Sequence, residues 1–368
     1  MKKTLIALAV LGATSSFAMA ASNVTLYGVV NTGVLAENAK KTDTTVSLKS
    51  GFTAGSRWGI KGTEDLGNGY QVGFILEQGF NSDDGSEGAE GKQFNRESVL
   101  SVKGDFGSLA FGRTGALSFA QSQAILTGWV FGTSWGNGAW SSIGKSFSRM
   151  DNVISYATPK MGGFTVHAMY SNGTAEDDAA EKWSANNHYY GLGVKYQEAA
   201  IKSSLIFEMQ DGKATKDRAE AQYVINYGLE YNLGDWTPMF AYQYNWQDGG
   251  NKNHIVGLSA KADVAGGKLM LGARYLFGET ENTTVIANNG DEDKQRVWTV
   301  GAAYEYPLSK RTAIKAYAGY AGGDKIYDSD GVQKIETDKT TGAKTVTLYG
   351  DSANYNGYQF YIGMRHSF

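Results

Sequence analysis

Apolar and polar residues alternate in short segments along most of the chain. At its C-terminal end, every second residue from Tyr358 to Phe368 is aromatic, aliphatic or histidine, and Gln359, Gly363 and Arg365 stand between them. Successive side chains of a strand point to opposite faces, so this pattern predicts a strand with one apolar face. Such a strand of about ten residues is typical of a membrane barrel that closes on its last strand. The last strand of a soluble sandwich is the alternative.

Sixteen segments of this kind are predicted, with no change of composition that would mark a linker. An even number is typical of single-chain bacterial outer-membrane barrels, and about sixteen strands leave an aqueous channel inside the barrel. The predicted strands are 24–35, 56–64, 70–80, 96–104, 108–113, 149–157, 164–171, 188–196, 201–209, 219–232, 236–246, 253–262, 268–277, 295–306, 311–321 and 354–368.

The connections between these segments alternate between short and long. The short ones, such as 65–69 and 263–267, contain Gly and Asp, which favour tight turns. The long ones, such as 81–95, 172–187 and 322–353, are polar. Outer-membrane barrels have short periplasmic turns and long extracellular loops. The sequence therefore predicts an all-β fold, a transmembrane 16-stranded antiparallel β-barrel with this arrangement of turns and loops.

The first twenty residues differ from the rest of the chain. Lys2 and Lys3 precede a short apolar stretch, and Ala18-Met19-Ala20 offers small residues for cleavage. This combination is typical of a secretory signal peptide rather than a membrane anchor. We therefore expect residues 1–20 to direct export and residues 21–368 to form a single outer-membrane domain.

Composition agrees with a barrel and excludes several other classes. The chain has 48 Gly, 22 Tyr, 16 Phe and 8 Trp but no Cys, so aromatic residues suffice for two interfacial girdles while disulfides and thiolate metal sites are excluded. The net charge of −3 gives no reason to expect nucleic-acid binding. No pair of histidines has the spacing of zinc ligands. Residues 132–136 match the pattern of a nucleophile elbow without its strand–turn–helix context. We expect no enzymatic activity, metal or cofactor.

Six short motifs follow one another along the chain. They are residues 24–28 (VTLYG), 56–69 (SRWGIKGTEDLGNG), 104–113 (GDFGSLAFGR), 151–156 (DNVISY), 308–312 (LSKRT) and 363–368 (GMRHSF).

Taken in this order, the motifs resemble the Gram-negative general porin family, in the branch typified by neisserial and comamonad porins. The resemblance implies a homotrimer of barrels in the outer membrane, through which small hydrophilic solutes and ions diffuse passively. It also implies that the third long loop, 114–148, folds into the lumen as a constriction. The C-terminal Phe368 would be the signal read by the barrel-assembly machinery. Acidic loop runs such as Asp83-Asp84 give a further hypothesis, divalent cations shared with lipopolysaccharide phosphates.

The resemblance also implies which residues narrow the pore, since family constriction arginines map onto Arg57, Arg96 and Arg149. Alternation independently places Arg57 and Lys61 on one face, opposite Trp58. The face of Arg96 stays open, because it is in phase with apolar residues, and a solvated rim charge is the alternative for each arginine. The full set of expected lumen residues is Arg57, Lys61, Glu77, Arg96, Arg149, Asp151, Arg274 and Arg365.

The third loop departs from the family pattern. Residues 114–148 contain no Asp or Glu, whereas family loops usually place acids opposite the basic wall. Rings of Arg and Lys favour anions, which gives the hypothesis of a modest anion preference, offset by Glu77 and Asp151. The aromatic residues of the loop pack it against the wall, lie at the contact between barrels of the trimer, or form a platform for solutes. The loop residues concerned are Trp129, Phe131, Trp135, Trp140 and Lys145.

Two other functions remain open at this point. One is a solute-selective channel that uses the aromatic third loop. The other is a structural or adhesive outer-membrane barrel that acts through its extracellular loops and conducts little.

Overall fold

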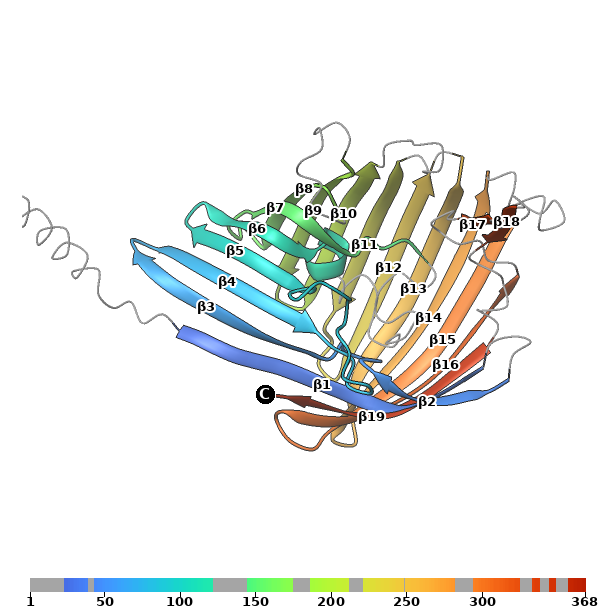
Figure 1. The fold of residues 1–368 in the computed structure, drawn as a ribbon. Coiled ribbons are helices and arrows are strands. Elements are labelled where there is room, and N and C mark those ends of the chain that lie inside the picture. Colours follow the sequence, from blue (N-terminus) through green and yellow to red (C-terminus); the bar gives the residue numbers. More distant parts are fainter. Residues whose placement is uncertain are drawn as a thin grey trace, which may run out of the picture.

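The main sheet of the protein closes on itself into a barrel (Figure 1). A computed structural model describes residues 23–38, 43–121, 144–174, 186–211, 221–247, 249–281, 294–324, 333–337, 344–348 and 357–368. In this part of the chain the main sheet has 17 strands, and every pairing in it is antiparallel. The predicted fold class is therefore confirmed.

Each predicted segment coincides with one strand of the barrel wall, with ends that differ by a few residues. The wall strands are β1 (Asn23–Asn38), β3 (Arg57–Gly67), β4 (Tyr70–Gly79), β5 (Glu97–Gly104), β6 (Gly107–Gly115), β7 (Arg149–Ala157), β8 (Phe164–Asn172), β9 (His188–Glu198), β10 (Ile201–Asp211), β11 (Gln222–Tyr231), β12 (Trp236–Gln247), β13 (Asn251–Val264), β14 (Gly267–Thr280), β15 (Lys294–Pro307), β16 (Thr312–Asp324) and β19 (Gly357–Ser367).

The barrel closes where its first and last strands meet. Strand β19 pairs with β1 from Val29 opposite Ser367 to Asn38 opposite Tyr358. Beyond the ladder, Gly28 and Phe368 exchange two backbone hydrogen bonds, each of 3.1 Å. The C-terminal end lies beside β1 in Figure 1. Every backbone group in lipid must find an internal partner, and this seam removes the two free edges that an open sheet would leave.

Three further strands lie in regions that the sequence pattern predicted as loops. Strand β2 (Thr45–Ser50) pairs with residues 32–37 of β1, whereas β3 pairs only with residues 23–29 of the same strand. Thus β2 occupies the part of the β1 edge that β3 leaves open. Strands β17 (Gln333–Thr337) and β18 (Lys344–Leu348) form a separate two-stranded hairpin.

The outer face of the wall is apolar, as the alternation predicted. In β14, Leu271, Tyr275 and Phe277 are exposed, while the intervening Arg274 is buried on the inner side. Aromatic side chains stack on one another across neighbouring strands, for example His254 against Phe277. This arrangement is typical of an interfacial girdle. The helix in the described part of the chain, η1 (Leu117–Gln121), is too short to span a membrane.

The short connections are tight turns with left-handed backbone conformations. Gly67 and Gly69 have φ values of 80° and 81°, which glycine adopts without strain. Ala265 occupies the same region with φ of 49°, although it carries a Cβ atom. The turn chemistry predicted from Gly and Asp is therefore present, with alanine at two strained positions, Ala265 and Ala199, the latter with φ of 46°.

Candidate pore constriction

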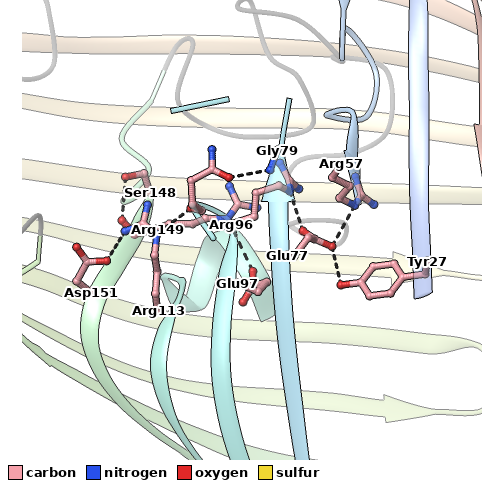
Figure 2. A network of polar contacts seen from close by, with 11 residues as sticks. Tyr27, Arg57, Glu77, Gly79, Arg96, Glu97, Arg113, Ser148, Arg149 and Asp151 are labelled. Carbon is pink, nitrogen blue, oxygen red and sulfur yellow. Dashed lines mark hydrogen bonds and ion pairs between the residues drawn. The ribbon is translucent and has the colours of Figure 1, made fainter. Parts of the chain in front are cut away.

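A cluster of charged side chains lines one side of the barrel, where β1 and β3 to β7 lie (Figure 2). Arg57 and Arg149 are the first residues of β3 and β7, and Arg96 immediately precedes β5. Cross-strand register brings their acidic partners level with one another, since Glu77 of β4 lies opposite Glu97 of β5. Residues predicted from distant motifs are thus brought together by strand pairing.

Glu77 lies at the centre of the cluster. Its carboxylate is 3.3 Å from Nε of Arg57 and 2.7 Å from Nε of Arg96. It also accepts a hydrogen bond of 2.9 Å from the hydroxyl of Tyr27. The Glu77 side chain is nearly buried, so the two guanidinium groups compensate a carboxylate that water barely reaches. Tyr27 belongs to the VTLYG motif, but nothing in the sequence indicated that it would bind Glu77.

The structure resolves the orientation of the first two arginines. Trp58 is exposed on the outer face, so Arg57 points inward as alternation predicted. Arg96 would point outward if β5 extended to it, because it is in phase with the exposed Leu100. It precedes the first strand residue, Glu97, and its guanidinium turns toward Glu77 instead.

Arg149 forms a second part of the cluster with Glu97. Its Nε lies 3.7 Å from the Glu97 carboxylate, and its guanidinium carbon lies 4.8 Å from the centre of the Phe119 ring. The cation–π contact ties the arginine to the beginning of the third loop. Together, Arg57, Arg96 and Arg149 face two carboxylates, those of Glu77 and Glu97, which leaves a net positive charge.

Asp151 does not join Glu77 but forms its own ion pairs. Its carboxylate is 2.6 Å from Nζ of Lys92 and 2.5 Å from Nη1 of Arg113. These three residues border a groove of about 790 Å³ that is also lined by the exposed Phe111 and Ile154. Neither Lys92 nor Arg113 was among the predicted site residues, although Arg113 ends the GDFGSLAFGR motif.

The remaining predicted lumen residues form no ion pair with Glu77 or Glu97 among the described residues. Nζ of Lys61 lies 5.1 Å from the centre of the Tyr27 ring. Arg365 pairs with Glu305 at 3.3 Å. Arg274 is buried on β14 and makes no contact with Glu77 or Glu97 among the ion pairs of the described residues.

Both described ends of the third loop attach to the inner wall of the barrel. On the entering side, the backbone N–H groups of Leu117 and Ser118 donate to the Tyr189 hydroxyl at 3.1 Å and to Glu208 at 3.2 Å. On the leaving side, the Gln243 amide exchanges two hydrogen bonds of 2.8 Å with the backbone of Lys145. The predicted inward fold is thus seen at the two ends of the loop that the structure describes, residues 114–121 and 144–148.

Inside the barrel, the wall beneath the third loop is apolar rather than uniformly polar. Ile255, Leu276 and Val297 are direct cross-strand neighbours on β13 to β15 and are almost fully buried. They belong to one cluster with Leu117 and Phe147 from the ends of the loop. Apolar side chains therefore also face the interior here, because the ends of the third loop pack against this part of the wall.

The other predicted loop residues are only partly described. Lys145 lies with Nζ 5.5 Å from the centre of the Phe147 ring. Trp129, Phe131, Trp135 and Trp140 lie outside the described residues.

A closed antiparallel barrel with an apolar exterior, a charged interior and a long loop whose described ends lie against the inner wall defines an outer-membrane channel. The chain belongs to the Gram-negative porin family, whose model matches residues 7–325. The predicted family, the location in the outer membrane and the function as a diffusion channel are thereby confirmed.

Named relatives support this assignment over nearly the whole chain. Outer membrane porin protein 32 of Delftia acidovorans is 31% identical over 388 residues, covering 100% of both chains. An outer membrane porin of Bordetella pertussis is 29% identical, covering 87% of this chain and 94% of its own. Among solved structures, the anion-selective porin from Comamonas acidovorans superposes with a TM-score of 0.71 at 26% identity, covering 94% of this chain and 100% of its own.

Proposed function

We propose that this channel prefers anions and that Arg57, Arg96 and Arg149 set the preference. The observation that supports it is the excess of guanidinium groups over the carboxylates of Glu77 and Glu97 in the cluster. Rings of arginine at a narrow point raise the local concentration of anions and lower that of cations. The Comamonas porin, which is described as anion-selective and is 26% identical to this chain, supports the same preference.

The inner wall where the third loop attaches supports the proposal, because its described polar groups are mostly neutral. Asn226 and Gln243 are amides, and the Gln243 amide binds the loop backbone. Glu208 is fully buried and accepts hydrogen bonds from Tyr189 and Asn226. A carboxylate held in this way does not meet a passing ion. We therefore infer that the arginine side of the lumen is positive. Among these residues, the wall near the third loop exposes no acidic side chain to balance it.

The same proposal includes how the channel is exported and assembled. Residues 1–20 serve as the export signal, and residues 21–368 form one barrel domain that assembles into a homotrimer. A trimer form is described for OmpT of Vibrio cholerae, which shares the fold at 18% identity. Phe368 is the residue that the barrel-assembly machinery recognises, and lipopolysaccharide surrounds the barrel. The channel performs no chemistry and needs no cofactor.

The test is a planar-bilayer measurement under a KCl gradient. We expect a reversal potential of anionic sign for the unmodified protein and a shift toward zero for Arg57→Gln combined with Arg149→Gln. Lys268→Gln is the matched control, because Lys268 pairs with Asp263 at an exposed periplasmic turn. A reversal potential of cationic sign for the unmodified protein would refute the proposal, and so would an unchanged potential for the double variant. Absence of conductance from folded protein would favour the structural or adhesive alternative.

A further inference from the structure

The first long loop also enters the barrel, which the sequence did not predict. Residues 51–56, which we call the inner turn, connect β2 to β3. The Phe52 side chain is buried inside the barrel, although its residue lies in a loop. Its ring stacks on Tyr361 with centroids 4.2 Å apart and meets Tyr317 edge-on at 5.4 Å.

Phe52 packs onto a single row of apolar side chains on the inner wall. Tyr361 faces inward, because its neighbours Phe360 and Ile362 are 53% and 60% exposed on the outside. The members of the row are consecutive cross-strand partners on five strands, and all of them are buried with Phe52 in one cluster. The row consists of Met270, Ala303, Tyr317, Tyr361 and Leu35.

A network of hydroxyl and amide groups fixes the inner turn beside Phe52. The backbone N–H of Asn31 donates to Oγ of Ser56 at 3.1 Å, and Oγ of Ser56 lies 3.2 Å from Oγ of Ser82 in the second loop. The Asn31 side chain donates to Thr53 at 2.7 Å and accepts from the Tyr361 hydroxyl at 2.9 Å. These groups are buried or partly buried, so each bond is costly to break. The network joins β1, β19, the inner turn and the second loop.

The inner turn reaches two of the constriction arginines directly. The Gly55 carbonyl accepts a hydrogen bond of 2.8 Å from Nη1 of Arg57. A Cβ atom built on Gly55 would lie only 2.9 Å from Nη1 of Arg96, so that guanidinium rests against the glycine backbone. The positions of both guanidinium groups that bind Glu77 therefore depend on the position of the inner turn.

We infer that Phe52 is a positioning residue for ion selection. By anchoring the inner turn to the aromatic row, it holds Gly55 at the height where Arg57 and Arg96 converge on Glu77. Phe52 touches no permeating ion and acts through the two guanidinium groups. This role rests on the anion preference proposed above.

The experiment uses the full-length channel and exploits the absence of cysteine from the chain. Phe52→Ala removes the stack, and Phe52→Tyr keeps the ring. Phe106→Ala is the matched control, because Phe106 stacks on Tyr70 in another part of the barrel. A spin label on Ala54→Cys reports the mobility of the inner turn in each background, and a KCl gradient reports the reversal potential. Phe52→Leu replaces Phe52→Ala if the latter fails to fold in a heat-shift gel.

In Phe52→Ala we expect the label to become mobile and the reversal potential to lose about half its magnitude. The reason is that the guanidinium groups of Arg57 and Arg96 lose their fixed positions. Phe52→Tyr and Phe106→Ala should match the unmodified channel. A label that stays immobile refutes the anchoring role. A mobile label with an unchanged anion preference refutes the positioning of the arginines. A cation-preferring unmodified channel refutes the proposed function instead.

Discussion

Replacing Glu77 by Gln tests the electrostatics of the proposed constriction most directly. The change removes the carboxylate that lies 3.3 Å and 2.7 Å from two guanidinium nitrogens while keeping the size of the side chain. A pair of unit charges 4 Å apart attracts by about 4 kcal/mol at an effective dielectric constant of 20. The Arg57 and Arg96 side chains are 26% and 21% exposed, so screening reduces each pair to about 1–2 kcal/mol. We expect a destabilised but folded channel.

The same change makes the lumen more positive by one charge. A unit charge about 8 Å from a passing ion contributes about 0.5 kcal/mol in water, and a Debye length of about 10 Å at 0.1 M salt lowers this to about 0.2 kcal/mol. That energy corresponds to a change of about 1.5-fold in the local ion concentration, which rises for anions and falls for cations. The anion-over-cation permeability ratio should therefore rise roughly twofold at 0.1 M salt, and less at 1 M, where the Debye length is about 3 Å.

Reversal potentials measured at both salt concentrations check this prediction. Glu77→Asp retains the charge and should change the ratio little. Glu64→Gln removes an exposed carboxylate near the periplasmic end of β3 and serves as the matched control. An unchanged or lower anion preference in Glu77→Gln would mean that ions do not pass close to this cluster, and the reasoning would be wrong.

Three other changes test the seam, the third loop and a turn. Gly28→Val should prevent barrel closure, because a Cβ atom at this position would lie 2.2 Å from the Phe368 ring; a heat-shift gel should show loss of the folded form. Gln243→Leu should remove both bonds to Lys145, cost about 1–3 kcal/mol and increase current noise in single-channel records. Ala265→Gly should stabilise the barrel by about 0.5–1 kcal/mol, because φ is 49° there, measured by urea unfolding in detergent.

The sequence predicted the barrel wall well because alternation is a local property that membrane and lumen impose on every strand. The same alternation oriented Arg57, whose neighbours lie within β3. It left Arg96 open because that residue stands just outside β5, where phase no longer determines direction. The resemblance to porins supplied what alternation did not, namely that the third loop turns inward at both of its described ends.

Features that depend on distant contacts escaped the sequence. The role of Phe52 depends on Tyr317 and Tyr361, which join it only after the barrel has closed. Strand β2 forms because β3 leaves part of the β1 edge open. The local sequence of β2 does not indicate where the pairing of β3 with β1 ends. Lys92 lies in a loop and its partner Asp151 lies on β7, far away in the sequence. The sequence pattern around Lys92 therefore did not indicate this ion pair.

Strand β1 pairs with three strands, β2 and β3 along one edge and β19 along the other. This arrangement has a consequence for the order of folding. The partners β2 and β3 follow β1 closely in the chain, so this three-stranded unit has low contact order and can form early. The opposite edge of β1 then waits with unpaired backbone groups until β19, the last strand, arrives. The early unit presents the edge of β1 from Val29 to Asn38, along which β19 pairs. Closure of the barrel is therefore the docking of one strand onto a finished template, rather than the meeting of two flexible ends.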